Sequence, residues 1–590
     1  MKDPISFYKR QLHTHRAQLA KVKKQLYVSG MLRLTIFLLI VFLVYWTFGN
    51  TQLVLGISAV GVALFLFLVS RHTRLQYLHD KTKALISINT TELEVQNRNF
   101  HHLPEGNEFK NPAHYFSQDI DLFGRGSFYQ YANRTALREG SAALAAVFTE
   151  NAIQHIVVKQ KAIRELSELP EWRQEFSGVA ALIKTSTDTR TIATWLEKYQ
   201  PFVSQRIKYF TPLFSVGSIA ILIATFFSLL PFSALLIWLS IGLCFSFFFF
   251  GKIRKLAAFA ENAQSTFRQY QQLIVQLEGI EFQSSLLKEQ QQNLVYAEKK
   301  TSDLLKTFSD ILHTLDHNNN LLYLIFANGF FLQGLHKAYR IEKWIGEHGI
   351  DVAKWFDTVA TFDAYNSLGN FAFNHPDYTF PTITDGSVLL TATKVGHPLL
   401  APNKRVLNNI HIEKTQFFIV TGANMAGKST FLRTVSLQIM MANVGLPVCA
   451  AKMDYCPMKL ITSMRTTDSL TDEESYFFSE LKRLRFIVDA LESDTYFIVL
   501  DEILKGTNSS DKAIGSRKFL EKLVGAKATG IIATHDLSLC EAAEEMKQLQ
   551  NYYFDAEIVN NELHFDYTFK KGICQNMNAS FLLKKMGIVD

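Results

Sequence analysis

The chain lacks the cysteine patterns that stabilise secreted domains or hold structural metals. Its 590 residues include five cysteines, and none of them forms a Cys-x-x-Cys pair or a cluster of ligands. Disulfide scaffolds and zinc ribbons are therefore excluded, and a reduced cytosolic environment is expected. The formal net charge of +7 is small for this length. It neither requires nor excludes contact with nucleic acid or with an anionic membrane.

Charged side chains are scarce in four long apolar runs, which cover Met31–Phe48, Leu53–Ser70, Pro212–Leu230 and Phe232–Phe250. Arg33 is the one charged residue within them, and it is close enough to an end for its side chain to reach the interface. Each run approaches the roughly 20 helical residues that cross a bilayer. Because very short links join the runs in pairs, the sequence predicts two transmembrane helical hairpins.

Lysine and arginine flank the outer ends of both hairpins, whereas the tight turns carry no charge. Since these residues are retained on the cytoplasmic side, we expect a multi-pass protein of the inner (cytoplasmic) membrane, with both termini and the soluble segments in the cytosol. A signal peptide is disfavoured because the first run is long, lacks a small-residue cleavage site and is followed at once by a second run. Buried helices of a soluble protein are disfavoured because polar residues are scarce on every face.

The remaining segments divide into a helical part and an α/β part, so we expect a multidomain protein. Spaced Leu, Ile and Phe in a Gln-rich stretch after the second hairpin fit a helical stripe, either of a coiled-coil strut or of a solvated amphipathic helix. Towards the C-terminus, β-rich runs alternate with helices, which predicts a central sheet. The predicted boundaries are 1–30 for a basic cytosolic tail, 31–70 for the first hairpin, 71–205 for a helical core, 206–251 for the second hairpin, 252–374 for long lever helices and 375–590 for an α/β domain.

The stretch TGANMAGKST carries the pattern of a phosphate-binding loop, G-x-x-x-x-G-K-[ST]. Gly422, Gly427, Lys428 and Ser429 occupy its fixed positions, after an apolar strand and before a helix. Glycines let backbone N–H groups fold around phosphate at the positive end of the helix dipole. We expect Lys428 to reach the β and γ phosphates of ATP and the Ser429 hydroxyl to hold Mg²⁺.

Two further strands end in residues that suit ATP hydrolysis. The run YFIVLDE ends in Asp501 and Glu502, which we expect to hold Mg²⁺ and to polarise the attacking water, respectively. The run TGIIATHD places His535 at its end, in position to sense the γ-phosphate. Acids at a strand end are often merely solvated and a lone histidine is usually structural, so these roles depend on the order of the three elements.

These motifs resemble those of the MutS family of DNA mismatch-repair ATPases. The family's loop, TGPNMGGKST, differs from this one at Ala423 and Ala426. The resemblance implies that Asn424 and Thr430 of the loop also contact the nucleotide. The ATH sequence that ends at His535 is shared with the family as well.

The family's pattern continues after the acidic strand, where DEILKGTNSSD resembles D-E-x-x-R-G-T-x-x-x-D. Lys505 replaces the usual arginine, and Asp511 occupies the final acidic position, which implies a nucleotide-site role for Asp511. The stretch TTDSLTDEESYFFSEL resembles the family segment that ends in S-T-F-x-x-E. Ser475 corresponds there to the serine that completes the neighbouring subunit's ATP site, so the resemblance implies a homodimer; an ordinary helix-cap serine is the alternative.

Weaker similarities extend the resemblance beyond these motifs. VGHPLL and LNNI are similar to family elements that place His397 and Asn408 near the nucleotide. Over 71–205 and 252–374, stretches such as NRTALREG and FDAYNSLGNFAF resemble the family's core helices. The resemblance therefore implies an α/β P-loop ATPase domain joined to an all-α core and lever region.

Family resemblance implies an ATPase that binds DNA and is related to mismatch repair. The family reads mispaired bases with a Phe-x-Glu wedge, but only a basic tail and the first hairpin precede the core, and the match at Phe259–Glu261 falls inside a helix. A DNA-independent, membrane-associated mechanochemical or signalling ATPase is therefore the alternative. A transporter subunit is disfavoured because L-S-G-G-Q is absent and the spans are few. We expect ATP to close two ATPase domains and the long helices to carry that motion to the hairpins.

Overall fold

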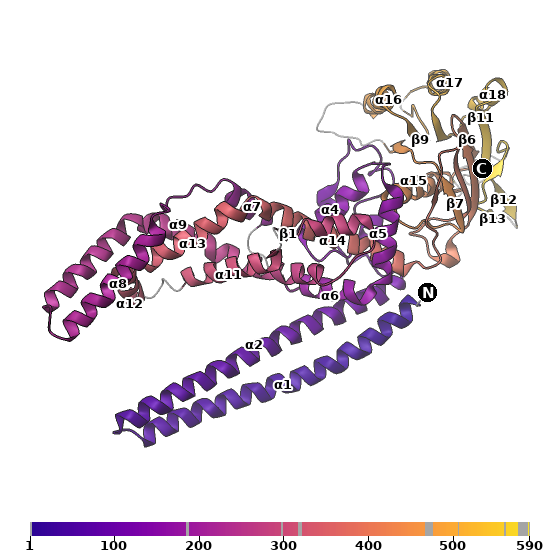
Figure 1. Cartoon of the computed structure of the whole chain (residues 1–590). Helices are drawn as coiled ribbons and strands as arrows, with labels where there is room; N and C mark the ends of the chain where they lie inside the picture. The colour runs from indigo at the N-terminus through magenta and orange to yellow at the C-terminus, as the bar shows by residue number, and fades with distance from the viewer. Residues whose placement is uncertain are drawn as a thin grey trace.

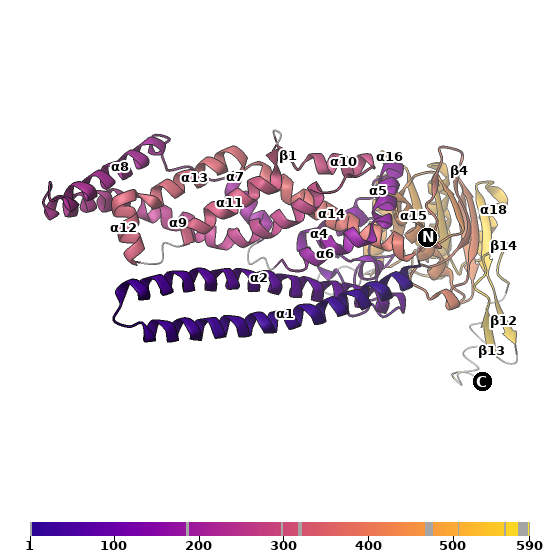
Figure 2. The same cartoon turned by 60° about the horizontal axis from the view of Figure 1, so that its bottom comes forward.

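A computed structural model describes residues 3–183, 188–296, 299–316, 321–465, 476–505, 507–559, 562–575 and 588. The molecule is elongated, with a sheet-containing domain at one end and helices that extend away from it (Figure 1). Two helical hairpins point away from the sheet domain, so their tips lie at the far end of the molecule (Figures 1 and 2).

The first hairpin consists of the long antiparallel helices α1 (Pro4–Trp46) and α2 (Thr51–Gln96). Each begins at a side-chain cap, because Asp3 accepts hydrogen bonds from the backbone of α1 and Asn50 accepts one from the backbone of α2. The apolar runs predicted for this hairpin form only its outer part. Both helices continue towards the core, so the segment predicted as a basic tail is an extension of α1.

The second hairpin consists of α8 (Ile207–Phe226) and α9 (Phe232–Glu278). Two further helices, α12 (Leu321–Phe331) and α13 (Gln333–His348), pack against it. Within the described residues, four helices are long and apolar enough to cross a membrane, namely α1, α2, α8 and the first part of α9. They are the helices in which the sequence analysis predicts membrane spans.

The 11-residue apolar helix α12 is an element that the sequence analysis did not single out. A hydrogen bond from the Ser218 hydroxyl of α8 to the Phe330 carbonyl joins it to the hairpin. The backbones of α9 and α12 touch where two glycines meet, because a Cβ on Gly242 would lie 1.9 Å from the carbonyl oxygen of Gly329. Hairpin and lever region are therefore packed together.

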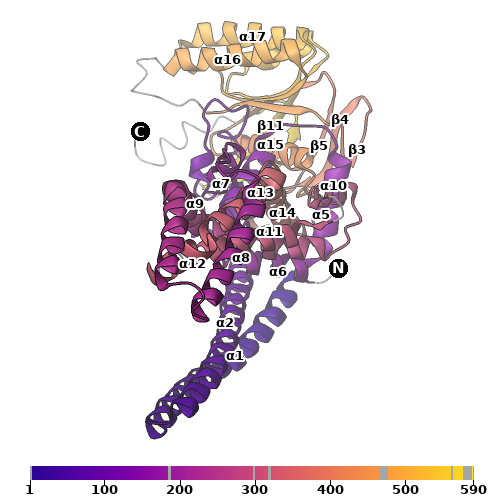
Figure 3. The ribbon, with the colours of Figure 1, turned by 60° about the vertical axis from the view of Figure 1, so that its left-hand side comes forward.

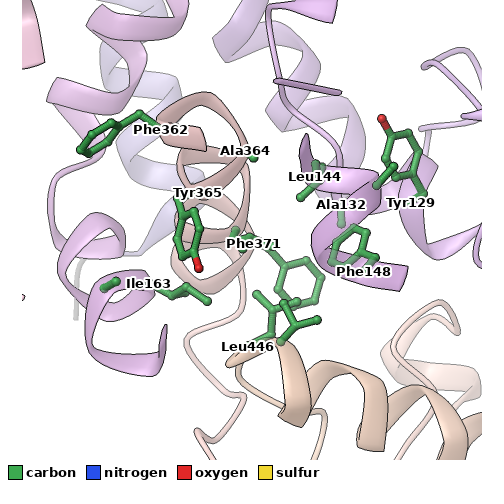
Figure 4. Close-up of a cluster of buried hydrophobic side chains, with 14 of the residues drawn as sticks. Tyr129, Ala132, Leu144, Phe148, Ile163, Phe362, Ala364, Tyr365, Phe371 and Leu446 are labelled. Carbon is green, nitrogen blue, oxygen red and sulfur yellow. The ribbon is translucent and has the colours of Figure 1, made fainter. Parts of the chain in front are cut away.

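The helical core is built around α14 (Asp351–Asn374), which is buried over most of its length. Aromatic side chains of α14, α3 and α4 form a cluster that also reaches Leu446, just beyond the first helix of the sheet domain (Figure 4). Core and sheet domain thus share one hydrophobic core. The other elements are η1 (Asn107–Phe109), α3 (Phe128–Ala132), α4 (Arg138–Thr149), α5 (Ile156–Glu168), α6 (Pro170–Ala180), α7 (Thr189–Glu197), α10 (Ser285–Gln292), β1 (Val295–Tyr296), β2 (Lys299–Lys300) and α11 (Thr301–Asp316).

The sheet domain contains a six-stranded sheet in the order β14-β11-β6-β10-β9-β8, whose strands are parallel except for β14. A four-stranded sheet in the order β3-β7-β4-β5 lies beside it. The strands are β3 (Thr382–Ile383), β4 (Val388–Val395), β5 (Asn408–Glu413), β6 (Phe417–Gly422), β7 (Lys452–Tyr455), β8 (Lys459–Ser463), β9 (Tyr496–Asp501), β10 (Thr529–Ala533), β11 (Leu549–Phe554), β12 (Ala556–Val559), β13 (Glu562–Phe565) and β14 (Lys570–Lys571).

Helices cover both faces of the six-stranded sheet, as alternating side chains on its strands require. Phe418 and Val420 of β6 face the core that includes α15 (Lys428–Val444), whereas Phe417 and Ile419 belong to a second cluster with the helices of the other face. Figure 3 shows α16 and α17 above the sheet, on the side opposite the first hairpin. The helices of that face are α16 (Tyr476–Ser493), α17 (Ser509–Gly525) and α18 (Ser538–Glu545); the remaining short element is η3 (Pro402–Lys404).

Candidate functional site

The carboxyl ends of three adjacent parallel strands, β6, β10 and β9, form the candidate site. Ala533 of β10 pairs with Asp501 of β9 on one side and with Val420 of β6 on the other. The backbone N–H of Glu502 donates to the Ala533 carbonyl at 2.9 Å, which continues the ladder past the strand ends. Residues that follow the three strands are thereby brought to one edge of the sheet, where ligands bind in α/β folds.

The loop between β6 and α15 has the backbone that a phosphate-binding loop needs. Gly422 and Gly427 have positive φ angles of 150° and 103°, which glycine adopts without a steric penalty. A Cβ at Gly427 would lie 2.9 Å from the Tyr567 ring, and a Cβ at Gly422 would lie 2.6 Å from the Phe554 carbonyl oxygen. Backbone conformation and close contacts therefore both require glycine at these two positions.

Lys428 is buried and curls back over this loop. Its ammonium group donates hydrogen bonds to the carbonyl oxygens of Gly422 at 2.8 Å and of Ala423 at 3.0 Å. Burial lowers the pKa of Lys428, whereas the nearby carboxylates of Glu502 and Asp501 act in the opposite direction. The charge of Lys428 is thus held at the mouth of the loop, where backbone N–H groups begin α15.

Glu502 and His535 meet Lys428 at the edge of the sheet. The Nε2 atom of His535 lies 3.0 Å from the Glu502 carboxylate and 3.2 Å from the Lys428 ammonium nitrogen. The hydrogen bond with His535, aided by Lys505 at 3.8 Å, lowers the pKa of Glu502 to about 2. Glu502 is therefore ionised at neutral pH. In a neutral His535 ring, a protonated Nε2 would donate to Glu502, whereas an unprotonated Nε2 would accept from Lys428. The tautomer of His535 therefore depends on whether the Lys428 ammonium points towards it.

The remaining residues predicted to bind ATP and Mg²⁺ line the same edge. Asn424, Ser429 and Thr430 are exposed around the start of α15, and Asp501 is half-buried at the end of β9. No group of three or more His, Cys, Asp or Glu side chains gathers to hold a metal ion in the part of the chain that the structure describes. One hydroxyl and one carboxylate nevertheless fit Mg²⁺ bound to a nucleotide, because that ion takes one or two protein oxygens and completes its shell with phosphate and water.

A cavity of about 350 Å³ adjoins the loop and contains several residues that sequence reasoning placed near the nucleotide. Its walls include His397, Asn408, Gly427 and Thr430. Burial, with further contributions from neighbouring arginines, lowers the pKa of His397 to about 4, so its ring is neutral near pH 7. The position and size of the cavity suit the nucleoside part of a ligand whose phosphates lie in the loop.

The segment 567–569 contributes Tyr567 to one wall of this cavity and was not found by sequence reasoning. The Asn408 amide donates to the Tyr567 carbonyl at 3.0 Å and accepts from the Phe569 N–H at 2.8 Å. The Phe569 ring stacks on Phe431 of α15, with 4.4 Å between ring centroids. Asn408 is therefore a positioning residue for this wall.

Glu480 of α16 is a second residue that sequence reasoning missed. It is buried, and its carboxylate accepts hydrogen bonds from the backbone N–H groups of Leu504 at 2.6 Å and Lys505 at 3.0 Å. Glu502 and Leu504 both have left-handed φ angles, of 51° and 59°, and such conformations persist where their surroundings enforce them. Glu480 supplies that constraint. It is the final glutamate of the stretch that resembles S-T-F-x-x-E, which is the signal that could have identified it.

Two predicted site residues are not brought to the loop by the described structure. Asp511 is exposed in the first turn of α17, where its N–H donates to the capping side chain of Asn508 at 2.8 Å. Ser475, the residue predicted to complete a neighbouring subunit's site, lies outside the described residues. The composite dimer site therefore remains a prediction.

Comparison with known proteins assigns the segment that contains this site. Residues 418–584 match the family model of MutS domain V. Over these residues the chain is similar to domain V of MutS proteins. The chain is 31% identical to MutS protein homolog 4 of Homo sapiens over 246 residues, which are 40% of this chain and 26% of that protein. It is 30% identical to the DNA mismatch repair protein MutS of Chlorobium chlorochromatii over 276 residues, which are 45% of this chain and 30% of that protein.

A plant relative gives the same result. The chain is 30% identical to the DNA mismatch repair protein MSH4 of Arabidopsis thaliana over 217 residues, or 35% of this chain and 27% of that protein. The chain thus covers 26–30% of the length of the MutS relatives named here. The part that matches MutS domain V contains Lys428, Glu502 and His535.

Proposed function

We propose that this chain is a membrane-anchored MutS-like ATPase that binds and hydrolyses ATP with Mg²⁺ at a composite homodimer site. The convergence of Lys428, Glu502 and His535 at the ends of three adjacent strands carries this proposal. It is supported by the position of all three in the segment that matches MutS domain V, since proteins of the MutS family are ATPases.

Each residue of the site has a role in this proposal. The N–H groups at the start of α15 and the Lys428 ammonium bind the phosphates, and Ser429 with Asp501 would hold Mg²⁺, which neutralises charge on the phosphates when bound. Phosphate is a stronger acceptor than a peptide carbonyl, so Lys428 turns from Gly422 towards it. His535 is then free to donate to Glu502, whose ionised carboxylate orients the attacking water.

Exposed apolar surface on both hairpins supports membrane anchoring. Leu38, Phe67 and Phe248 are 58%, 65% and 83% exposed, and contiguous apolar surface of this kind is unusual on soluble proteins. The cationic flanks support a location of both termini and the sheet domain in the cytosol, at the inner (cytoplasmic) membrane.

Two coupled processes are open to this ATPase. Two of the relatives are named as DNA mismatch repair proteins, so a DNA-binding role related to mismatch repair is the first. The second is a DNA-independent mechanochemical or signalling role at the membrane. The packing of the apolar hairpin of α8 and α9 directly against α12 and α13 favours it, because motion of these helices then acts on the membrane-facing surface.

The ATPase assignment is tested with full-length protein in detergent. We expect Lys428→Ala to abolish binding of a fluorescent ATP analogue. Glu502→Gln should retain binding but hydrolyse ATP about 100-fold more slowly or worse, because a positioned base contributes about that much. Lys518→Ala and Glu541→Gln, exposed residues of the same domain, are matched controls and should behave as wild type. Equal turnover in all variants would contradict the assignment.

Binding of homoduplex and mismatched DNA across a salt series separates the two processes. A steep loss of affinity with salt and no preference for the mismatch indicates contact with the DNA backbone alone. Absence of binding at low salt supports the DNA-independent role. Light scattering of Glu502→Gln with and without ATP tests the homodimer, which is expected to form or tighten with nucleotide.

A further inference from the structure

A large cavity lies at the base of the second hairpin, far from the nucleotide site. It has a volume of about 920 Å³ and opens between α7 and α9. Arg190 and Lys198 of α7 and Lys252 and Lys255 of α9 line it, together with aromatic side chains that include Trp195. We call it the interfacial cavity.

The four cations of the interfacial cavity have no ion-pair partner in the described structure. No aspartate or glutamate is among its lining residues in the described structure. Within the same described ranges, Arg190, Lys198, Lys252 and Lys255 form no salt bridge, unlike exposed cations such as Arg485 and Arg517. Like charges gathered in one cavity repel each other and raise the local concentration of anions. The cavity therefore favours an anionic ligand.

The walls of the interfacial cavity are held in place by buried contacts. The Trp195 ring stacks on Phe259 of α9, with 3.5 Å between centroids and 11° between planes. The carboxylate of Glu342, from α13, accepts hydrogen bonds from the N–H groups of Phe202 at 2.8 Å and Val203 at 2.9 Å and from the Tyr199 hydroxyl at 2.9 Å. The cavity is thus formed before a ligand binds, which lowers the cost of binding.

If the second hairpin spans a bilayer, the four cations lie at about the same depth along the membrane normal as the lipid phosphates. The apolar run of α9 ends at Phe250, and at 1.5 Å per residue Lys252 and Lys255 lie about 3 Å and 8 Å beyond it. The headgroup layer of each leaflet is about 5–8 Å thick. Below the cavity, Phe202 faces Phe249 of α9 at 6.5 Å between ring centroids, so an apolar surface leads from the cations towards the hydrocarbon.

We propose that the interfacial cavity binds the phosphate headgroup of an anionic phospholipid of the cytosolic leaflet. The inference rests on the membrane anchoring proposed above. Lys252 and Lys255 contact the phosphate from α9, Arg190 and Lys198 from α7, and the acyl chains follow the aromatic surface of α9. Basic pockets beside membrane helices on the cytosolic side suit this class of ligand. A bound lipid would join the second hairpin to α7 and, through it, to α14.

The test measures lipid adducts on full-length protein in detergent by native mass spectrometry. Dioleoyl-phosphatidylglycerol should bind in preference to dioleoyl-phosphatidylcholine. The double variant Lys252→Gln/Lys255→Gln should bind phosphatidylglycerol about tenfold more weakly or worse, since each lysine near anionic lipid contributes about 1 kcal/mol. The matched control is Arg71→Gln/Arg74→Gln, which removes two exposed cations with the same spacing at the cytosolic end of the first hairpin. It should bind as wild type does.

Inorganic phosphate is tested separately, because a soluble phosphate ion carries negative charge like the headgroup of an anionic lipid. Thermal stabilisation by millimolar phosphate, with no preference among the lipids, would overturn the lipid assignment. Equal binding of the two lipids, or equal loss in both double variants, would also overturn it. Alkaline carbonate extraction of membranes tests membrane anchoring separately from lipid binding. Release of the wild type would overturn both membrane anchoring and this inference. Retention in the membrane without a preference among the lipids would overturn this inference alone.

Discussion

The two apolar hairpins are joined to the rest of the molecule by different physical means. The first is attached at its base, where the start of α1 and the end of α2 contact α14 through buried polar groups. The second is attached along its apolar part, where α12 packs against α8 and α9 with glycine backbones in contact. Directional hydrogen bonds therefore fix the position of the first hairpin, whereas close packing of helix backbones fixes the position of the second.

A buried polar network makes up the base of the first hairpin. Glu92 of α2 accepts hydrogen bonds from Arg134 at 2.7 Å, Asn370 at 2.9 Å and Asn374 at 2.7 Å. The Tyr8 hydroxyl of α1 donates to Asn374 at 2.7 Å. The two asparagines lie in the last turns of α14, immediately before the sheet domain. This network therefore links the first hairpin to the end of α14, which precedes the sheet domain.

Removal of Glu92 should have the largest effect on stability among the variants that compare the two hairpins. Glu92→Ala leaves the Arg134 side chain, which is 14% exposed, without its carboxylate. Loss of one partner of a buried ion pair costs about 3–5 kcal/mol, which is an upper bound for this partly exposed pair. Thermal unfolding in detergent should therefore shift to clearly lower temperature. Glu94→Ala, which removes the neighbouring partly exposed carboxylate, is the control and should shift unfolding little. Equal shifts would show that the first hairpin is not held by this network.

Overpacking at Gly242 should have the next largest effect. Gly242→Ala directs a methyl group at the Gly329 backbone, and forced insertion of a methyl group costs about 1–3 kcal/mol. A disulfide cross-link engineered between α9 and α12 should form less efficiently in this variant. Gly56→Ala in the first hairpin is matched, because nothing lies within 4 Å of a Cβ there. An unchanged cross-link in Gly242→Ala would refute the close packing of the second hairpin.

The helix that supports both hairpins, α14, should respond to pH through Asp363. Burial raises the pKa of Asp363 to about 7, although its carboxylate accepts hydrogen bonds from the N–H groups of Ala136 and Leu137. The unfolded chain releases this proton near pH 4, so stability falls as pH rises from about 4 to about 7 and levels off above that. Between pH 6 and 8 the wild type should lose about 1.4 kcal/mol relative to Asp363→Asn. Urea unfolding at both pH values measures it, and parallel curves would contradict the raised pKa.

The smallest effect is expected from the Tyr8 hydroxyl. Tyr8→Phe keeps the ring, which packs edge-on against Phe373 at 5.8 Å between centroids, and removes one hydrogen bond worth about 1 kcal/mol. Protease protection of the first turns of α1 should decrease while global unfolding changes little. Tyr27→Phe, an exposed position of the same helix, should leave protection unchanged. Unaltered protection in Tyr8→Phe would indicate that packing alone holds the end of α1.

Sequence was sufficient for elements whose chemistry is local. The phosphate loop, the acidic strand and the ATH sequence are short contiguous patterns, and parallel pairing of their strands brings them together. Apolar runs likewise identify the outer parts of the hairpins. The sequence predicts the inner parts of the hairpin helices as a tail or a core. The reason is that polar residues with good helix propensity continue the helices past the end of the apolar runs.

Contacts between distant segments could not be predicted in this way. Tyr8 and Asn374 are 366 positions apart, and nothing local to a basic N-terminal stretch indicates a buried tyrosine. The helix α12 has 11 residues, too few to suggest a membrane span. Glu480 accepts hydrogen bonds from the loop after Glu502 although it lies 24 positions upstream of Leu504. The family pattern could have marked Glu480, but the groups that it contacts become visible only with the fold.

If α9 spans a bilayer, as proposed above, its unbroken length has a consequence for how that bilayer acts on the protein. Its 47 residues contain no proline and span about 70 Å at 1.5 Å per residue. Helices answer a change in hydrocarbon thickness by tilting, and a tilt of about 5° displaces the end of a rod of that length by about 6 Å. A small change in the thickness of the surrounding lipid would then move the far end of α9 by several ångströms.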